Sequence, residues 1–154
     1  MQNSITKENQ DYINVVKNLT NRSNFEKNLD TQKKQNWKVE HLKKYLEDNG
    51  NFEIRNTIHL AGSKGKGSTA HFINSILIES KKNILLYTSP DLHAVTERIV
   101  LNGKQISKEL FVKIASEYTE NNFFNNWSYF ELMTIIAWKA AQMQNCEWQV
   151  IETG

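Results

Sequence analysis

The sequence predicts an α/β fold in which helices pack on the faces of a largely parallel sheet. Short apolar runs typical of strands alternate along the chain with stretches whose apolar residues have helical spacing. A helix between two strands returns the chain to the same end of the sheet, which favours parallel pairing. The chain has 154 residues, 39% of them hydrophobic, which is enough for one domain with its own core.

Two helices are predicted before the first strand. Apolar residues at helical spacing mark one helix over residues 12–19 and another over residues 39–46, which ends near Asn49–Gly50. The stretch 20–36 between them is polar and is expected to be rich in loops. We therefore expect residues 1–36 to form a helical lead-in to the domain that follows.

The remaining elements alternate between strand and helix. In chain order we expect a short buried strand over 57–61, a helix beginning at or just after Gly67, a strand over 84–88, a hairpin over 99–106, two helices capped by Ser107 and Ser128, and a strand over 148–152. The hairpin is predicted because Asn102–Gly103 supplies the positive φ angles of a tight turn. These elements complete the strand and helix alternation of an α/β domain.

Composition excludes several classes of protein. The net charge is only +2 and no long basic tract is present, so we expect no nucleic-acid partner. No apolar run approaches the ~18 residues that span a bilayer, and the polar N-terminus shows no signal peptide, so we expect no membrane partner. The single cysteine, Cys146, excludes an internal disulfide and is consistent with a cytoplasmic protein.

A glycine-rich turn lies between the strand predicted over 57–61 and the next helix. It reads AGSKGKGST and holds three of the six glycines of the chain together with Lys64 and Lys66. Glycine lets backbone N–H groups converge on a ligand, and the amino end of the following helix adds a positive dipole. Such a turn suits a polyphosphate. The alternative is a turn that only lets the strand and helix pack closely.

The turn does not match the strict P-loop pattern G-x-x-x-x-G-K-[ST], because Leu60 stands at the first glycine position and Gly67 follows Lys66. Residues 59–69 instead resemble the nucleotide loop of folylpolyglutamate synthases and dihydrofolate synthases, members of the Mur-type ligase superfamily. The loop of that family reads G-T-N-G-K-G-S-T, and Ser63 and Lys64 replace its threonine and asparagine.

Further segments resemble the same family in the same order. They are YTSPDL at 87–92 for Y-T-S-P-H-L, ERI at 97–99 with Asn102–Gly103 for E-R-I…N-G, FELMT at 130–134 for F-E-x-x-T, and VIETG at 150–154, which resembles the start of a strand that leads into L-G-G-R-x-D. Asp91 stands where the family has histidine. The resemblance runs from about Trp37 to the last residue.

The resemblance implies a three-layer, P-loop-type ATP-binding domain like the central domain of Mur ligases. Residues 37–154 would be the N-terminal portion of that domain, with its remainder and a C-terminal domain absent. We therefore expect an incomplete domain that is inactive by itself, and a monomer for the full-length protein.

The resemblance also implies site residues. Lys66 is the expected catalytic residue, since the matching lysine contacts ATP phosphates. The expected nucleotide-binding residues are Gly62, Ser63, Lys64, Gly65, Lys66, Gly67 and Ser68, and the expected Mg²⁺ ligands are Ser68, Ser89 and Glu131.

Structural alternatives remain open for each of these side chains. In the simplest alternatives, Lys66 is an ordinary surface lysine, Ser68 is a helix cap and Ser89 is an ordinary turn residue. Glu131 also completes an S-x-x-E capping box with Ser128. A cluster of aromatic residues likewise has two interpretations, a pterin site or core packing: Phe123, Phe124, Trp127, Tyr129 and Phe130.

The implied activity is ATP-dependent amide ligation, in which L-glutamate is joined to dihydropteroate or folate through an acyl phosphate, with ATP and Mg²⁺ as cofactors. Two alternatives remain. One is another Mur-type ligase that acts on cell-wall precursors, and the other is a non-catalytic nucleotide-binding remnant. Gly67 after Lys66, together with YTSP, favours the folate branch.

Overall fold

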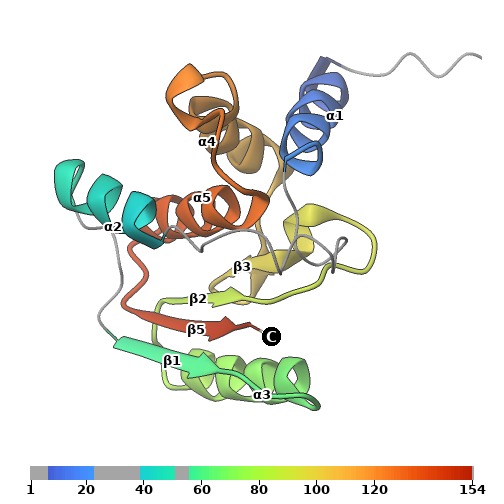
Figure 1. Ribbon diagram of the computed structural model, residues 1–154. Coiled ribbons are helices and arrows are strands. Elements are labelled where there is room, and N and C mark those ends of the chain that lie inside the picture. The colour runs from blue at the N-terminus through green and yellow to red at the C-terminus, as the bar shows by residue number, and fades with distance from the viewer. Residues whose placement is uncertain (1–6, 23–38, 51–55, 154) are drawn as a thin grey trace, which may run out of the picture.

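The structure is a computed structural model that describes residues 7–22, 39–50 and 56–153 (Figure 1). The predicted domain boundary at residues 36 and 37, most of the predicted polar loop, and Gly154 lie outside the described residues. Within them the chain forms helices and strands in the order α1 (Lys7–Thr20), α2 (Val39–Asp48), β1 (Asn56–Leu60), α3 (Lys66–Glu79), β2 (Ile84–Tyr87), η1 (Val95–Arg98), β3 (Ile99–Leu101), β4 (Lys104–Gln105), α4 (Lys108–Thr119), η2 (Asn122–Phe124), α5 (Tyr129–Met143) and β5 (Trp148–Glu152).

The strands form one sheet in the order β1-β5-β2-β3-β4. β5 lies between β1 and β2 and is parallel to both, whereas β2–β3 and β3–β4 are antiparallel. The α/β class is confirmed, but the prediction of a largely parallel sheet is wrong, because the sheet is mixed. The reason is that β2 and β3 are joined by a loop and the short η1 rather than by a crossover helix, so β3 runs back beside β2.

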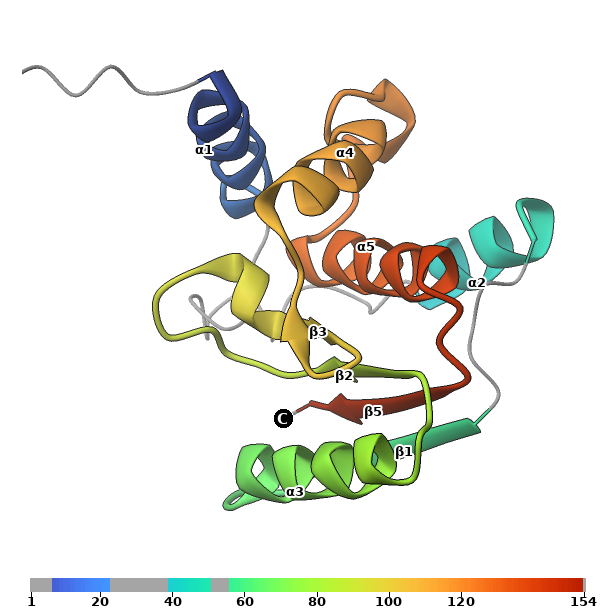
Figure 2. The same ribbon diagram turned by 180° about the vertical axis from the view of Figure 1, so that it is seen from behind.

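Helices cover both faces of the sheet (Figures 1 and 2). Side chains along β2 alternate between the two faces, as the pleat of a strand requires. Leu85 and Tyr87 join a large cluster with α1, α4 and α5, and Ile84 and Leu86 join a small cluster with α3. The larger part of the core therefore lies on the α5 face.

Local signals placed most helix ends correctly. The Ser107 hydroxyl accepts a hydrogen bond from the Leu110 N–H, and Ser128 caps α5 in the same manner. The predicted hairpin is present, with positive φ at Asn102 and Gly103. The helix α3, however, begins at Lys66, earlier than the prediction of Gly67 or later. None of the helices in the described ranges combines the length and apolar character that a membrane crossing requires.

The strand β1 differs from its prediction as a buried strand. It lies at the edge of the sheet, and only Ile58 and Leu60 are partly buried. His59, on its exposed side, has Nε2 2.7 Å from the Thr153 hydroxyl, so it is a hydrogen-bonding residue. An apolar run does not distinguish a central strand from an edge strand, because the difference depends on which strands pair with it.

Candidate functional site

The predicted site residues lie at one end of the sheet, where the parallel strands have their carboxyl ends. We call this end the carboxyl edge of the sheet. Because β1, β5 and β2 are parallel, their carboxyl ends meet there, on the right in Figure 1. The glycine-rich turn follows β1, Ser89 follows β2, and Glu152 ends β5. The helix α5 runs opposite to β5, so its amino end with Glu131 also points toward this edge. Open α/β sheets bind ligands at such an edge.

The turn after β1 leaves the amino end of α3 open. Gly65 precedes the helix with a φ of 73°, a left-handed conformation that favours glycine. Among the described residues no side chain caps this end, and no atom lies within 4 Å of where a Cβ on Gly65 or Gly67 would stand. The first backbone N–H groups of α3 therefore have no side-chain acceptor among the described residues.

Ser68 does not cap the helix. It is the third helical residue, it is exposed, and the capping position belongs to Gly65. The alternative interpretation of Ser68 as a helix cap is therefore wrong. Its role toward phosphate or metal stays a prediction.

Lys66 lies beside a buried carboxylate. Its Nζ is 3.5 Å from Glu152 Oε1, and the Glu152 side chain is only 3% exposed. The other carboxylate oxygen, Oε2, accepts a hydrogen bond of 2.7 Å from the Ser89 N–H. A buried carboxylate is costly unless it is paired, so this arrangement holds the glycine-rich turn and the Ser89 loop together.

Glu152 is the residue of this site that the sequence did not reveal. It was assigned only to the final strand. The sequence held one signal for Glu152, which is its place at the end of a predicted strand. A glutamate that is buried in a strand is almost always paired, so this position indicates a partner. The pairing itself joins residues 63 positions apart in the case of Ser89, which no local pattern reports.

Glu131 is engaged at the start of α5. Its Oε2 accepts hydrogen bonds of 2.7 Å from both the N–H and the hydroxyl of Ser128, while the Glu131 N–H donates to Ser128 Oγ at 3.3 Å. The capping box is therefore confirmed. A capping role and metal binding are not exclusive, and the metal role of Glu131 stays a prediction.

In the described part of the chain, no three His, Cys, Asp or Glu side chains gather in a way that could hold a metal ion. The predicted ligands Ser68, Ser89 and Glu131 include only one such side chain, so this finding does not decide the matter. The donor types do fit magnesium, which prefers hard oxygen ligands and keeps several waters. Glu152 adds a second carboxylate at the same edge.

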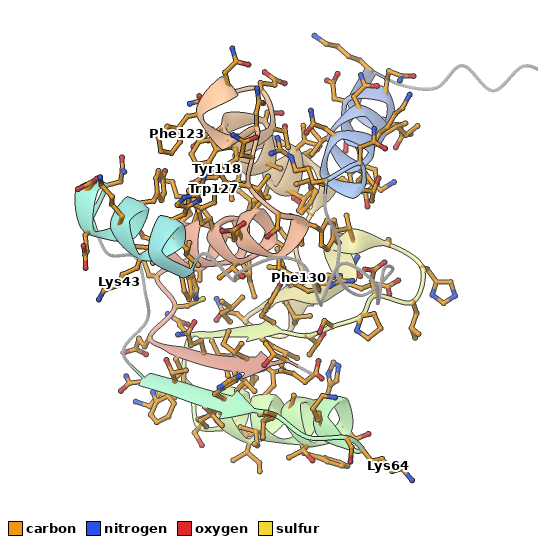
Figure 3. All side chains as sticks on the ribbon, in the orientation of Figure 1. Lys43, Lys64, Tyr118, Phe123, Trp127 and Phe130 are labelled. Atoms are coloured by element: carbon orange, nitrogen blue, oxygen red, sulfur yellow. The ribbon has the colours of Figure 1, made fainter. Side chains whose placement is uncertain are left out.

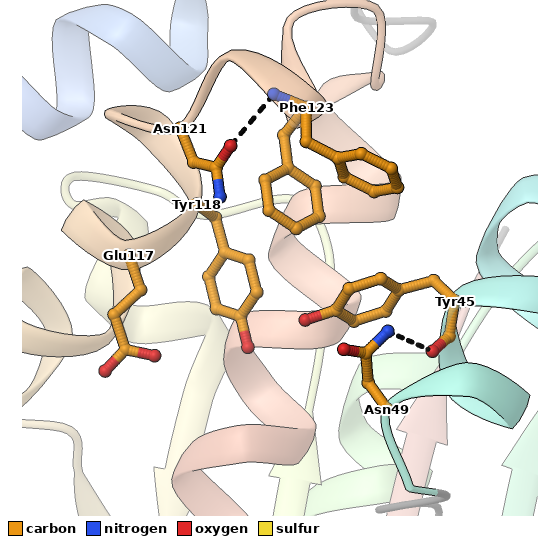
Figure 4. A pocket seen from close by; sticks show the side chains of 7 residues that line it. Tyr45, Asn49, Glu117, Tyr118, Asn121 and Phe123 are labelled. Carbon is orange, nitrogen blue, oxygen red and sulfur yellow. Dashed lines mark hydrogen bonds between the residues drawn. The ribbon is translucent and has the colours of Figure 1, made fainter.

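A pocket of about 470 Å³ lies elsewhere, among α2, α4 and η2 (Figure 4). It is lined by Tyr45, Asn49, Glu117, Tyr118, Asn121, Phe123 and Phe124. Figure 3 shows Lys64 at the opposite end of the molecule from Tyr118 and Phe123. Since Phe124, Trp127 and Tyr129 are buried, core packing is the role of these three aromatic residues, whereas Phe123 is 64% exposed.

Comparison with known proteins identifies relatives of this chain. A probable folylpolyglutamate synthase of Schizosaccharomyces pombe is 40% identical over 121 residues, which are 64% of this chain and 22% of the relative. Over these residues the chain is similar to folylpolyglutamate synthases. It spans about a fifth of the length of the curated relatives that it matches. No family model matches it.

Solved structures of the family share the fold. The folylpolyglutamate synthase of Thermotoga maritima matches with a TM-score of 0.76 and 29% identity, over 94% of this chain and 33% of that one. The Mycobacterium tuberculosis folylpolyglutamate synthase, complexed with ADP, matches with a TM-score of 0.77 and 22% identity, over 96% of this chain and 33% of that one. The predicted resemblance to this family is thus confirmed.

Proposed function

We propose that this chain carries the phosphate-handling residues of an ATP-dependent ligase that joins L-glutamate to folate or dihydropteroate. The observation that carries the proposal is the meeting of Lys66, the open amino end of α3 and the Glu152–Ser89 pair at one sheet edge. Its relatives are named folylpolyglutamate synthases, and a protein of the same fold is complexed with ADP. We keep the P-loop-type binding mode as part of this proposal.

The proposed reaction proceeds in two steps. A substrate carboxylate attacks the γ-phosphorus of ATP, the bond from that phosphorus to the β,γ-bridging oxygen breaks, and ADP leaves. The glutamate amine then attacks the acyl phosphate, phosphate leaves, and the amine loses a proton as the amide forms. Activation is needed because a carboxylate is a poor electrophile.

Lys66 would offset the repulsion between the reactants. Two unit charges ~4 Å apart repel by ~1 kcal/mol in water and several-fold more where the dielectric is lower. The Lys66 side chain is 20% exposed and lies in the first turn of α3, so its ammonium can reach phosphate while the N–H groups of that turn bind phosphate oxygens. Glu152 would hold this ammonium in place until the nucleotide binds.

A magnesium ion would be held by oxygens from Ser89, Ser68 and the predicted Glu131, and we propose Glu152 as an additional carboxylate. Glu152 already faces one cation, Lys66, and accepts from the loop that carries Ser89. When bound, the ion would neutralise charge on the transferring phosphoryl group. The role of the protein is to orient these oxygens and the nucleotide at the sheet edge.

Isothermal calorimetry with Mg-ATP tests the proposal. Unmodified protein should release heat on binding, and Lys66→Ala should weaken binding by about tenfold or more, as expected for loss of a charge-assisted contact. Lys104→Ala removes an exposed lysine from β4 and serves as the matched control, with affinity unchanged. Equal affinities for Lys66→Ala and Lys104→Ala, or no heat at all, would refute the proposal.

A second experiment compares the proposed magnesium-binding roles of Glu152 and Glu131. Glu152→Gln should reduce the magnesium dependence of nucleotide binding, because a carboxylate beside Lys66 and Ser89 is lost. Glu131→Gln should retain more of it, since its present contacts lie within the cap of α5. The reverse order would favour Glu131 as the principal carboxylate ligand.

A further inference from the structure

We propose that Asp91 is a positioning residue, whose ion pair with Arg98 holds the loop after β2 so that Ser89 keeps its contact with Glu152. The consequence for nucleotide binding rests on the function proposed above. The effect on the loop itself does not, and the two are measured separately. Residues 88–98 connect β2 to β3 and include this loop.

Arg98 is the buried partner of this ion pair. The residue is only 3% exposed, and its guanidinium carbon lies 5.1 Å from the centroid of the Tyr129 ring. Tyr129 is itself 2% exposed and begins α5. The Arg98 carbonyl also accepts a hydrogen bond of 3.0 Å from the Thr88 N–H. Arg98 is therefore joined both to the main core and to the first residue after β2.

Asp91 is the partly exposed partner of the ion pair. Its carboxylate pairs with Nε of Arg98, seven positions along the chain, and its side chain is 28% exposed. An ion pair with a buried guanidinium is less screened by water than a surface pair, and removing one partner leaves the other charge poorly compensated. The pair therefore anchors the beginning of the loop to the core through Arg98 and Tyr129.

Glu97 supports the same loop in a different way. Its carboxylate accepts hydrogen bonds from the N–H groups of Leu92, His93 and Ala94, at 2.9, 3.2 and 3.2 Å. All three donors lie within the loop, so Glu97 sets the shape of residues 92–94. Asp91 is the side chain that connects this shaped loop to the buried Arg98.

The loop carries the contact that matters for the site. Ser89 lies two residues before Asp91, and its N–H donates to Glu152 Oε2 at 2.7 Å. Glu152 in turn lies 3.5 Å from Lys66. A shift of the loop by about 1 Å would lengthen the Ser89 hydrogen bond beyond its working distance. Losing the Asp91 carboxylate should therefore disturb Glu152 and, through it, Lys66.

Amide hydrogen exchange followed by NMR tests the effect on the loop. In Asp91→Asn the Ser89 amide should exchange about tenfold faster, whereas the Leu86 amide within β2 should be unchanged. Asp48→Asn, at the exposed end of α2, is the matched control and should leave both amides unchanged. Asp91→Glu retains a carboxylate and should restore slow exchange at Ser89. Unchanged Ser89 exchange in Asp91→Asn would overturn the inference.

Calorimetry with Mg-ATP tests the consequence. Asp91→Asn should weaken binding by a smaller factor than Lys66→Ala, and Asp91→Glu should recover part of the affinity. If the unmodified protein bound no nucleotide, the proposed function would fail while the exchange measurement still decided the role of Asp91. If exchange at Ser89 rose but affinity stayed at the unmodified value, the link from Asp91 to the phosphate site would be wrong.

Discussion

The two faces of the sheet differ in how they are packed. On the α5 face, a continuous cluster of buried side chains joins α1, α4, α5 and η2 to the strands. On the α3 face, the buried cluster contains four residues, Ala70, Ile84, Leu86 and Val150, while Phe72 and Ile76 of α3 are 70% and 64% exposed. Hydrophobic stabilisation follows the apolar area removed from water, so we assign most of the stability to the α5 face.

The difference between the two faces suggests that the residues of the candidate site contribute little to the stability of the fold. The open amino end of α3 and Lys66 belong to the sparsely packed side, and the site is completed by residues at the strand ends. Side chains in such a region can be changed with little effect on the main core.

The largest expected effect comes from the α5 face. Phe111 of α4 is fully buried, with its ring centroid 6.1 Å from that of Tyr12. Phe111→Ala should lower the free energy of unfolding by about 3–5 kcal/mol, because it removes a large buried ring and leaves a cavity. Phe72→Ala, the same substitution on the exposed side of α3, should change it by less than about 0.5 kcal/mol. Urea denaturation measures both, and equal losses would contradict the contrast.

A smaller effect is expected at the helix starts. Ser128→Ala removes the cap of α5 and should cost about 1 kcal/mol. Ser68→Ala lies in the first turn of α3 but caps nothing, so unfolding should change by less than about 0.5 kcal/mol. Its effect should appear instead as weaker Mg-ATP binding. A stability loss for Ser68→Ala as large as that for Ser128→Ala would show that this serine supports the fold.

The smallest effect concerns Glu97, whose side chain is 31% exposed. Hydrogen bonds from the N–H groups of Leu92 and His93 hold the pKa of Glu97 below its usual value. Because the folded pKa is depressed, the stabilisation is present above the ordinary glutamate range and is lost as pH falls through the folded pKa. The protection of the Leu92 amide, measured as its exchange rate relative to that of an unfolded peptide at the same pH, should therefore fall on acidification, and Glu97→Gln should weaken this pH dependence. Glu47→Gln on α2 is the control, and an unaltered profile in Glu97→Gln would contradict the assignment.

Local features of the fold were predictable because they depend on neighbours in the sequence. The caps at Ser107 and Ser128 join residues three positions apart, and the turn at Asn102–Gly103 requires only two residues with positive φ. The resemblance in the glycine-rich turn and the segments after it also identified the family, because those motifs are short and contiguous. Lys66 was placed correctly at the amino end of a helix after a strand.

Features that depend on pairing between distant segments were not predictable in this way. The sequence does not state that β5 inserts between β1 and β2, and this insertion leaves β1 as an edge strand and brings Glu152 to the site. The same holds for the antiparallel addition of β3, which made the sheet mixed.

The helices, the caps, the hairpin turn and the glycine-rich turn could be predicted from the sequence alone, because each is stabilised by contacts over a few residues. The contacts of Glu152 with Lys66 and Ser89, and the burial of Arg98 against Tyr129 with its ion pair to Asp91, depend on the tertiary structure. The physical reason is that a charged side chain is buried only where other segments supply its partners, and the strand order brings those segments together.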